Sequence, residues 1–300
     1  MHIVRRRGWE LSERLVTPEA LVLGRRATLA GAGSVVLAAA APERNPKYVP
    51  GRDITPEKYA TTYNNYYEFS DGKDLWEAAQ VLKQRPWTIS LEGELKQPRT
   101  IAIDDLLKQV QLEERVYRHR CVEAWAMTVP WTGFPLSQLL KIAEPLGSAK
   151  YIVFETEQDK TMPGLNSPFY PWPYIEGLAL DEAANDLAFV STGLYGKPLP
   201  PQNGGPIRLT VPWKYGFKSC KALTKISFSE KRPMNFWQAI QPAEYGFWAN
   251  VNPAVAHPRW SQAQERLLGS NEMVPTQIYN GYGEFVASLY SDRKNEKLFM

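Results

Sequence analysis

Cys121 lies in the segment RHRCVEAWAM and is one of only two cysteines in this 300-residue chain. Arginines precede it by one and three positions, and Glu123 follows it by two. Nearby cations favour the thiolate, which is both a nucleophile and a soft metal ligand. From these residues alone, three interpretations of the thiol stay open: a disulfide with Cys220, an inert buried group, or a thiolate that binds metal or attacks a substrate.

Glu123 has the chemistry of a proton-transfer group. The alternating segment RVYRHRCVE predicts a strand that ends at or near Cys121, and its continuation would place Glu123 on the same face as the thiol. A carboxylate at that position could give or take a proton during a reaction. Its alternative role is to pair with Arg118 or Arg120.

The segment from Leu187 to Ser229 contains no Asp or Glu but has six Lys and Arg residues. Its central part, PPQNGGPIRLTVPWKYGFKSCK, combines a Pro/Gly loop, a predicted strand and a cation-rich turn. Glycines let main-chain N–H groups approach a ligand, and Arg208 with Lys221 could bind phosphate oxygens. This acid-free segment therefore indicates either an anion-binding site or a basic surface loop that acidic residues elsewhere neutralise.

The segment TTYNNYYEFS brings amide, phenol and carboxylate groups close together in the sequence. Such a density of donors and acceptors suits a heterocyclic ligand, and a tyrosine-rich core loop is the alternative. Common catalytic signatures are absent from the sequence, which has no C-x-x-C, C-x-x-C-H, G-x-G-x-x-G, P-loop or G-x-S-x-G motif. The few cysteines and histidines also cannot form a tetrahedral zinc site without carboxylates.

The N-terminal segment has the pattern of an export signal. Arg25 and Arg26 precede an uncharged, Ala-rich run that ends near Ala41 and is too short to span a bilayer. We expect residues 1–42 to be a cleaved twin-arginine signal and residues 43–300 to be one soluble domain in the periplasm. Without that signal, basic and acidic residues are equal in number, which argues against a nucleic-acid-binding protein.

Short predicted strands, separated by long Pro- and Gly-rich loops and a few helices, indicate an α+β fold. Alternating or β-branched runs predict strands in PWTISLEGEL, KYIVFET, PIRLTVPW and KALTKISFSE. TIAIDDLLKQV and FPLSQLLKIAEPL predict helices, the second of which begins near Pro135 and ends before Pro145. The proline-rich residues 43–60 predict an extended lead-in.

Several of these segments together resemble a known family. YNNYYEF, RCVEAWAM, KYIVFET, LPPQNGGPIRLTVPWKYGFKS, EYGFWANVNP and HPRWSQA are similar to segments of the catalytic subunits of periplasmic protein-methionine-sulfoxide reductases. These subunits are molybdenum enzymes of the sulfite oxidase family. The resemblance begins near residue 44 and extends to the C-terminus. It implies a sulfite oxidase-type molybdopterin-binding domain, with mixed β-sheets, short helices and long loops.

The resemblance also implies the residues of a site. Cys121 would be the protein ligand to the metal of a molybdenum–molybdopterin cofactor, and we assign proton handling to Glu123. Cys220 departs from the apolar or small residue expected in its turn, so we expect main-chain contacts from it. The residues implied to contact the cofactor are Asn64, Tyr67, Glu68, Thr156, Asn203, Arg208, Ser219, Cys220 and Lys221.

The implied reaction is oxygen-atom transfer from methionine sulfoxide residues of periplasmic proteins, with a haem-containing membrane subunit, fed by quinols, as electron donor. Two rival functions are a sulfite dehydrogenase and an exported anion-binding protein with a Cys121–Cys220 disulfide. Sulfite dehydrogenases usually carry an extra C-terminal immunoglobulin-like domain. The short stretch that follows the basic loop here favours a monomeric reductase.

Overall fold

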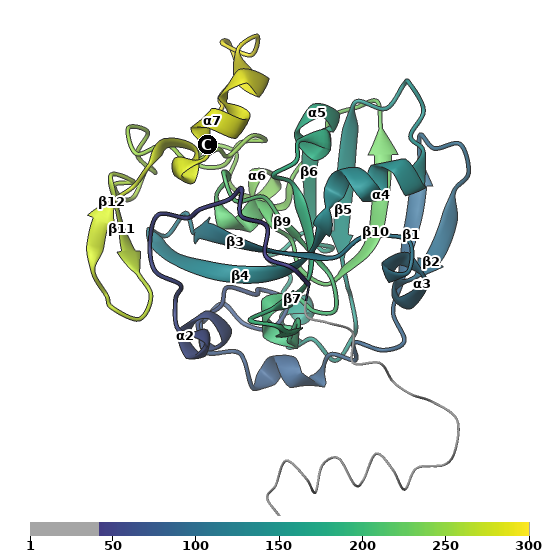
Figure 1. Cartoon of the computed structure of the whole chain (residues 1–300), viewed down its shortest axis with the longest axis horizontal. Helices are drawn as coiled ribbons and strands as arrows, with labels where there is room; N and C mark the ends of the chain where they lie inside the picture. The colour runs from purple at the N-terminus through teal and green to yellow at the C-terminus, as the bar shows by residue number, and fades with distance from the viewer. Residues whose placement is uncertain (1–41, 300) are drawn as a thin grey trace, which may run out of the picture. The chain divides into compact units, whose positions relative to one another are not determined.

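The computed structural model describes residues 42–299, and the chain from Pro42 onward forms one compact unit. The predicted export signal lies outside the described residues. Two β-sheets and several short helices make up this unit (Figure 1), in agreement with the predicted α+β class. Within residues 42–299, no helix has the length and apolar character needed to cross a membrane.

One sheet has five strands in the order β2-β1-β10-β5-β6. The strands β1 and β10 are parallel, and the other neighbours are antiparallel. Burial alternates along β5, as expected for a strand with one face on the core. The strands of this sheet are β1 (Thr88–Gly93), β2 (Arg99–Ala102), β5 (Tyr151–Thr156), β6 (Ile175–Ala179) and β10 (Leu223–Ser229).

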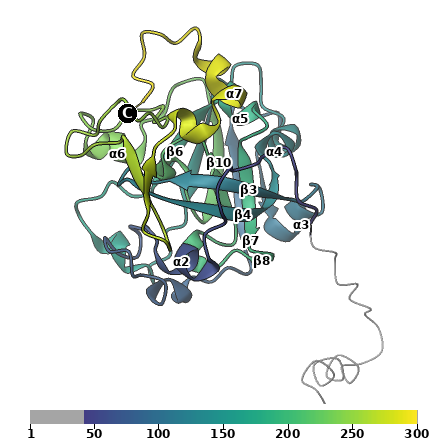
Figure 2. The same cartoon turned by 60° about the vertical axis from the view of Figure 1, so that its left-hand side comes forward.

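The second sheet has seven strands and is built around β4, which is buried along nearly all of its length. The strand β3 pairs with β4 in antiparallel register, while β11 and β7 pair with the two ends of β4. Figure 1 and Figure 2 both show β3 and β4 running across the direction of β10. The strands are β3 (Glu113–Arg120), β4 (Trp125–Pro135), β7 (Phe189–Leu194), β8 (Lys197–Pro198), β9 (Arg208–Thr210), β11 (Gln264–Leu267) and β12 (Met273–Pro275).

The helices are short. The helix α4 begins directly after Pro135, as predicted, whereas α2 occupies the end of the predicted extended lead-in. The strand β2 takes the first part of TIAIDDLLKQV, so only its middle is helical. The α-helices are α2 (Glu57–Thr62), α3 (Ile103–Leu107), α4 (Leu136–Ala143), α5 (Leu180–Ala184), α6 (Phe236–Ile240) and α7 (Gly283–Val286).

Short 3₁₀ turns connect several of these elements. Two of them, η4 and η5, flank β9 and belong to the acid-free segment. The 3₁₀ turns are η2 (Ala78–Val81), η3 (Pro163–Asn166), η4 (Pro201–Asn203), η5 (Gly216–Lys218), η6 (Ile278–Gly281) and η7 (Ala287–Tyr290).

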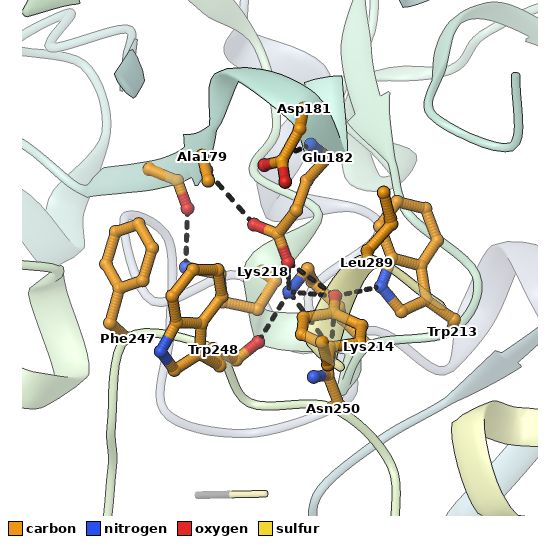
Figure 3. Close-up of polar contacts among 12 residues, drawn as sticks. Ala179, Asp181, Glu182, Trp213, Lys214, Lys218, Phe247, Trp248, Asn250 and Leu289 are labelled. Carbon is orange, nitrogen blue, oxygen red and sulfur yellow. Dashed lines mark hydrogen bonds and ion pairs between the residues drawn. The ribbon is translucent and has the colours of Figure 1, made fainter. Parts of the chain in front are cut away.

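Two lysines of the acid-free segment are neutralised inside the protein. Lys214 Nζ lies 2.5 Å from Glu182 Oε1, and Lys218 Nζ lies 2.6 Å from Glu176 Oε2, with all four side chains fully buried. Figure 3 shows Lys214 between Glu182 and the main-chain oxygen of Trp248, to which it donates at 2.7 Å. These contacts join the loop after β9 to α5 and β6. For these two lysines the alternative, neutralisation by acidic residues elsewhere, describes their role, although they are buried and not on the surface.

Replacement of Glu182 by Gln should lower the free energy of unfolding by about 3–5 kcal/mol, because Lys214 would lose its only carboxylate partner in residues 42–299. The matched control is Glu57→Gln. Its carboxylate pairs with Lys197 on the surface, where such a pair contributes about 1 kcal/mol or less. Urea denaturation measures both effects, and equal losses would contradict a special role of the buried pair.

Candidate functional site

Cys121 and Glu123 lie in the tight turn that joins β3 to β4. The Cys121 N–H donates to Trp125 O at 2.9 Å, and the Ala124 N–H donates to Cys121 O at 3.1 Å. Ala124 has a φ of 62°, which lies in the left-handed region that a turn of this kind requires. The strand β3 ends at Arg120, so Cys121 follows a strand end as predicted. This turn, and not a continuing strand, places Glu123 near the thiol.

The arginines beside Cys121 are engaged elsewhere. Arg118 donates to Gln277 Oε1 at 2.6 Å, and the fully buried Arg120 donates to Glu265 Oε2 at 2.8 Å and to the carbonyl oxygen of Cys121. Burial, followed by the charge of Glu123, raises the pKa of the Cys121 thiol to about 12. Burial thus outweighs the opposing charge of Arg120, and both arginines hydrogen bond to groups other than the thiol. They anchor the turn to the C-terminal segment, and a metal would have to displace the thiol proton.

A cavity of about 570 Å³ opens beside this turn. Thr156 does not line it, but its hydroxyl donates to Glu68 Oε1 at 2.8 Å and so supports a residue that does. The fold thus brings together residues that are far apart in the sequence. The other predicted site residues all line the cavity: Asn64, Tyr67, Glu68, Cys121, Glu123, Asn203, Arg208, Ser219, Cys220 and Lys221.

Arg208 and Lys221 give the cavity its positive charge. Arg208 is 2% exposed and donates to the main-chain oxygens of Asn203 and Ser219, both at 2.8 Å. Lys221 Nζ donates to Asn65 O at 2.7 Å. Burial lowers the pKa of Arg208 to about 10, and burial together with Arg208 lowers that of Lys221 to about 7. Within residues 42–299 neither cation has a carboxylate at ion-pair distance, and Glu68 acts on Lys221 only from farther away, so an anionic ligand would supply closer counter-charge.

Several buried polar atoms around the cavity also lack a partner. Asn64 Oδ1, Asn65 Oδ1, Tyr66 OH and Asn203 Oδ1 are buried and hydrogen bond to no residue in the described range. Buried polar groups are nearly always paired, so these atoms call for a ligand with many donors and acceptors. The residues fit a molybdenum–molybdopterin cofactor: Cys121 offers the soft metal ligand, the two cations suit a phosphate, and the unpaired atoms suit a pterin.

Two further expectations are wrong. Cys121 and Cys220 are both free thiols, so the disulfide alternative does not hold. Gly204 and Gly205 do not line the cavity. A Cβ on Gly204, which has a φ of 92°, would lie 2.5 Å from the Cβ of Lys221. This glycine therefore permits close packing of two chain segments rather than approach to a ligand.

The cavity is also lined by residues that the sequence patterns above do not indicate. His119 lies on β3 two positions before Cys121, so strand alternation could have revealed it. Burial, with Arg208 and Lys221 as further causes, lowers the pKa of His119 well below its usual value, which keeps the imidazole neutral.

A group of aromatic residues also lines the cavity, and no local sequence pattern marks it. We call it the aromatic wall, and it consists of Tyr67, which was predicted, with Tyr170, Trp237, Tyr245 and Trp260.

Comparison with known proteins agrees with this geometry. A family model described as an oxidoreductase molybdopterin binding domain matches residues 77–237. The chain is 50% identical over 261 residues to the "Protein-methionine-sulfoxide reductase catalytic subunit MsrP" of Burkholderia mallei, a match that covers 85% of this chain and 79% of that protein. This chain belongs to the family of protein-methionine-sulfoxide reductase catalytic subunits.

A second member of this reductase family, from Pseudomonas syringae pv. tomato, is 55% identical over 246 residues, which is 79% of this chain and 73% of that protein. Family membership confirms the predicted oxidoreductase class, the sulfite oxidase-type α+β domain and the molybdenum–molybdopterin cofactor. Among solved structures, the sulfane dehydrogenase SoxCD of Paracoccus pantotrophus matches with a TM-score of 0.48 and 16% identity. That match covers 72% of this chain and 60% of the other.

Replacement of Arg208 by Met should weaken retention of the cofactor by at least about tenfold, because charge-assisted hydrogen bonds to an anion would be lost. Pterin fluorescence and molybdenum mass spectrometry after dialysis measure the retained fraction. The matched control is Lys225→Met in the same acid-free segment, since Lys225 pairs with Glu155 outside the cavity and should be dispensable. Full retention in the Arg208 variant would contradict its assigned role.

Proposed function

We propose that this protein is the catalytic subunit of a reductase that returns methionine sulfoxide residues of periplasmic proteins to methionine. The family membership supports this function. The structural observation that supports it best is the meeting of the Cys121 thiol with two cations, Arg208 and Lys221, on one cavity. The overall reaction consumes two electrons and two protons, and it yields a thioether and water.

In this proposal Cys121 holds molybdenum, and the polar and cationic side chains hold the pterin and its phosphate. The bound cofactor would supply the two-electron redox chemistry and the site that accepts the sulfoxide oxygen. Cys121 Sγ gives up its proton to bind, and the β3–β4 turn fixes its position. Thr156 would act indirectly, because its hydroxyl donates a hydrogen bond that holds the carboxylate of Glu68 in position. The residues that would contact the cofactor are Asn64, Tyr67, Glu68, Asn203, Arg208, Ser219, Cys220 and Lys221.

We assign proton handling to Glu123. Its Oε2 lies 2.7 Å from Lys73 Nζ and accepts a hydrogen bond from Trp125 Nε1 at 3.3 Å. Because the side chain is 29% exposed and also lines the cavity, the carboxylate can exchange protons between water and the bound substrate. The alternative pairing with Arg118 or Arg120 is wrong, since both arginines bond to other groups.

Two substitutions separate these roles when molybdenum content and sulfoxide turnover are measured together. Cys121→Ser should lose both the metal and at least about a hundredfold of activity, because a metal ligand is removed. Glu123→Gln should keep the metal and lose about 10²–10⁴-fold in kcat, as expected for a general acid–base group. Cys220→Ser should retain its metal. Sulfite oxidation in place of sulfoxide reduction by the wild-type holoenzyme would contradict the proposed function.

The proposal includes export and an external electron donor. Arg25 and Arg26 would direct the folded protein through the twin-arginine route, and a haem-containing membrane subunit would deliver electrons from quinols. A variant with Arg25→Lys and Arg26→Lys should accumulate in the cytoplasm, as cell fractionation measures. Quinol-reduced membranes should show haem reoxidation only when both the enzyme and a sulfoxide are present. Export of the twin-lysine variant, or unchanged haem spectra, would contradict these two elements.

A further inference from the structure

The aromatic wall is continuous along one side of the cavity. Tyr67 packs edge-on against Tyr170 and Trp237, with ring centroids 5.7 and 4.9 Å apart, and Trp237 lies 5.3 Å from Tyr245. Aromatic surfaces favour contact with methyl and sulfur groups. This wall therefore suits the methyl group of a methylsulfinyl side chain. It does not by itself distinguish a small sulfoxide from one that is part of a polypeptide.

The guanidinium of Arg259, which lines the cavity, already has a carboxylate partner. Arg259, whose side chain is 54% exposed, lies 2.8 Å from Glu244, and the same carboxylate lies 3.2 Å from His257 Nε2. The His257 ring stacks on Trp260 at 3.8 Å, which fixes this end of the wall. Because the guanidinium has a carboxylate partner, this end of the cavity suits a neutral ligand group better than an ionised one.

Gln241, an uncharged polar residue, also lines the cavity, and its main chain bonds to two residues of the aromatic wall. Its main chain is fully used, since its N–H donates to Trp237 O at 2.9 Å and its carbonyl accepts from the Tyr245 N–H at 3.0 Å. Its side-chain Oε1, in contrast, is buried without a hydrogen-bond partner in residues 42–299. A primary amide carries an acceptor beside a donor, which complements the N–H and C=O groups of a peptide.

We propose that Gln241 binds the main-chain amide groups next to the sulfoxide residue, so that it determines preference for sulfoxides carried by a polypeptide. This inference rests on the proposed function. The aromatic wall takes up the methyl end of the methylsulfinyl side chain while Gln241 fixes the main chain from which that side chain extends. Gln241 makes no covalent bond and moves no proton, and it acts as a specificity-determining residue for a neutral peptide group.

The first test is peptide binding to the oxidised holoenzyme without reductant, measured by calorimetry with N-acetyl-methionine-sulfoxide-N-methylamide. Gln241→Met should raise the Kd about fivefold, as expected for loss of a hydrogen bond. Gln241→Ala is a second variant with the same expected direction. The matched control is Gln238→Met, because Gln238 Oε1 is also buried and unpaired but does not line the cavity. A Kd within about twofold of wild type for both Gln241 variants would overturn the inference.

The second test compares kcat/KM for the blocked peptide with kcat/KM for dimethyl sulfoxide, which has no peptide groups. The ratio of the two should fall about fivefold in Gln241→Met and stay at the wild-type value in Gln238→Met. Equal losses of kcat/KM for both sulfoxides would overturn the inference, because the substitution would then act on the cofactor or on the sulfoxide group and not on the peptide groups. If the wild-type holoenzyme reduces neither sulfoxide, the proposed function fails, and the Kd comparison still decides the role of Gln241.

Discussion

A guanidinium group buried without a carboxylate is costly, and the cavity contains such a group in Arg208. Only main-chain oxygens accept its hydrogen bonds in the described part of the chain, and the neighbouring Lys221 is likewise without an ion-pair partner there. An anionic ligand removes this cost. The need for a counter-charge therefore links the packing of the loop around β9 to the binding of a phosphate-bearing cofactor.

The same loop is held in place by charges that do have partners. Lys214 and Lys218 lie between Arg208 and Lys221 in the sequence, and they pair with the buried Glu182 and Glu176. Their ion pairs tie the loop to α5 and β6, so the unpaired cations are presented from a fixed framework. Neighbouring residues of one basic segment thus divide into structural cations and cations that face the cavity.

The position of the thiol depends on a different set of charges. Arg118 and Arg120 hold the C-terminal segment against β3, and Arg120 also binds the carbonyl oxygen of Cys121. The turn that carries Cys121 is therefore held both by the pairing of β3 with β4 and by the hydrogen bonds of these two arginine side chains. Burial raises the pKa of this thiol despite the opposing charge of Arg120, so a metal that bound there would have to displace the thiol proton.

Much of the fold could be predicted from local patterns. Alternation marked β1, β3, β5 and β10, and proline marked the start of α4, because these signals reside within single elements. The bounds of α2 and β2 could not be predicted, since their local preferences are weak and tertiary packing decides them. The buried strand β4 was not predicted either. It is covered along its length and shows no alternation.

The site divides in the same way. The sequence alone determined which residues can do chemistry, namely a thiol, an acid, a set of cations and an amide-rich loop, because side-chain chemistry is fixed by residue type. Only the tertiary structure decided which cations face the cavity, that both cysteines stay free, and that Gln241 and the rings of the aromatic wall line the same cavity. These properties depend on acids, carbonyls and rings from distant segments, and only folding brings such partners within bonding distance.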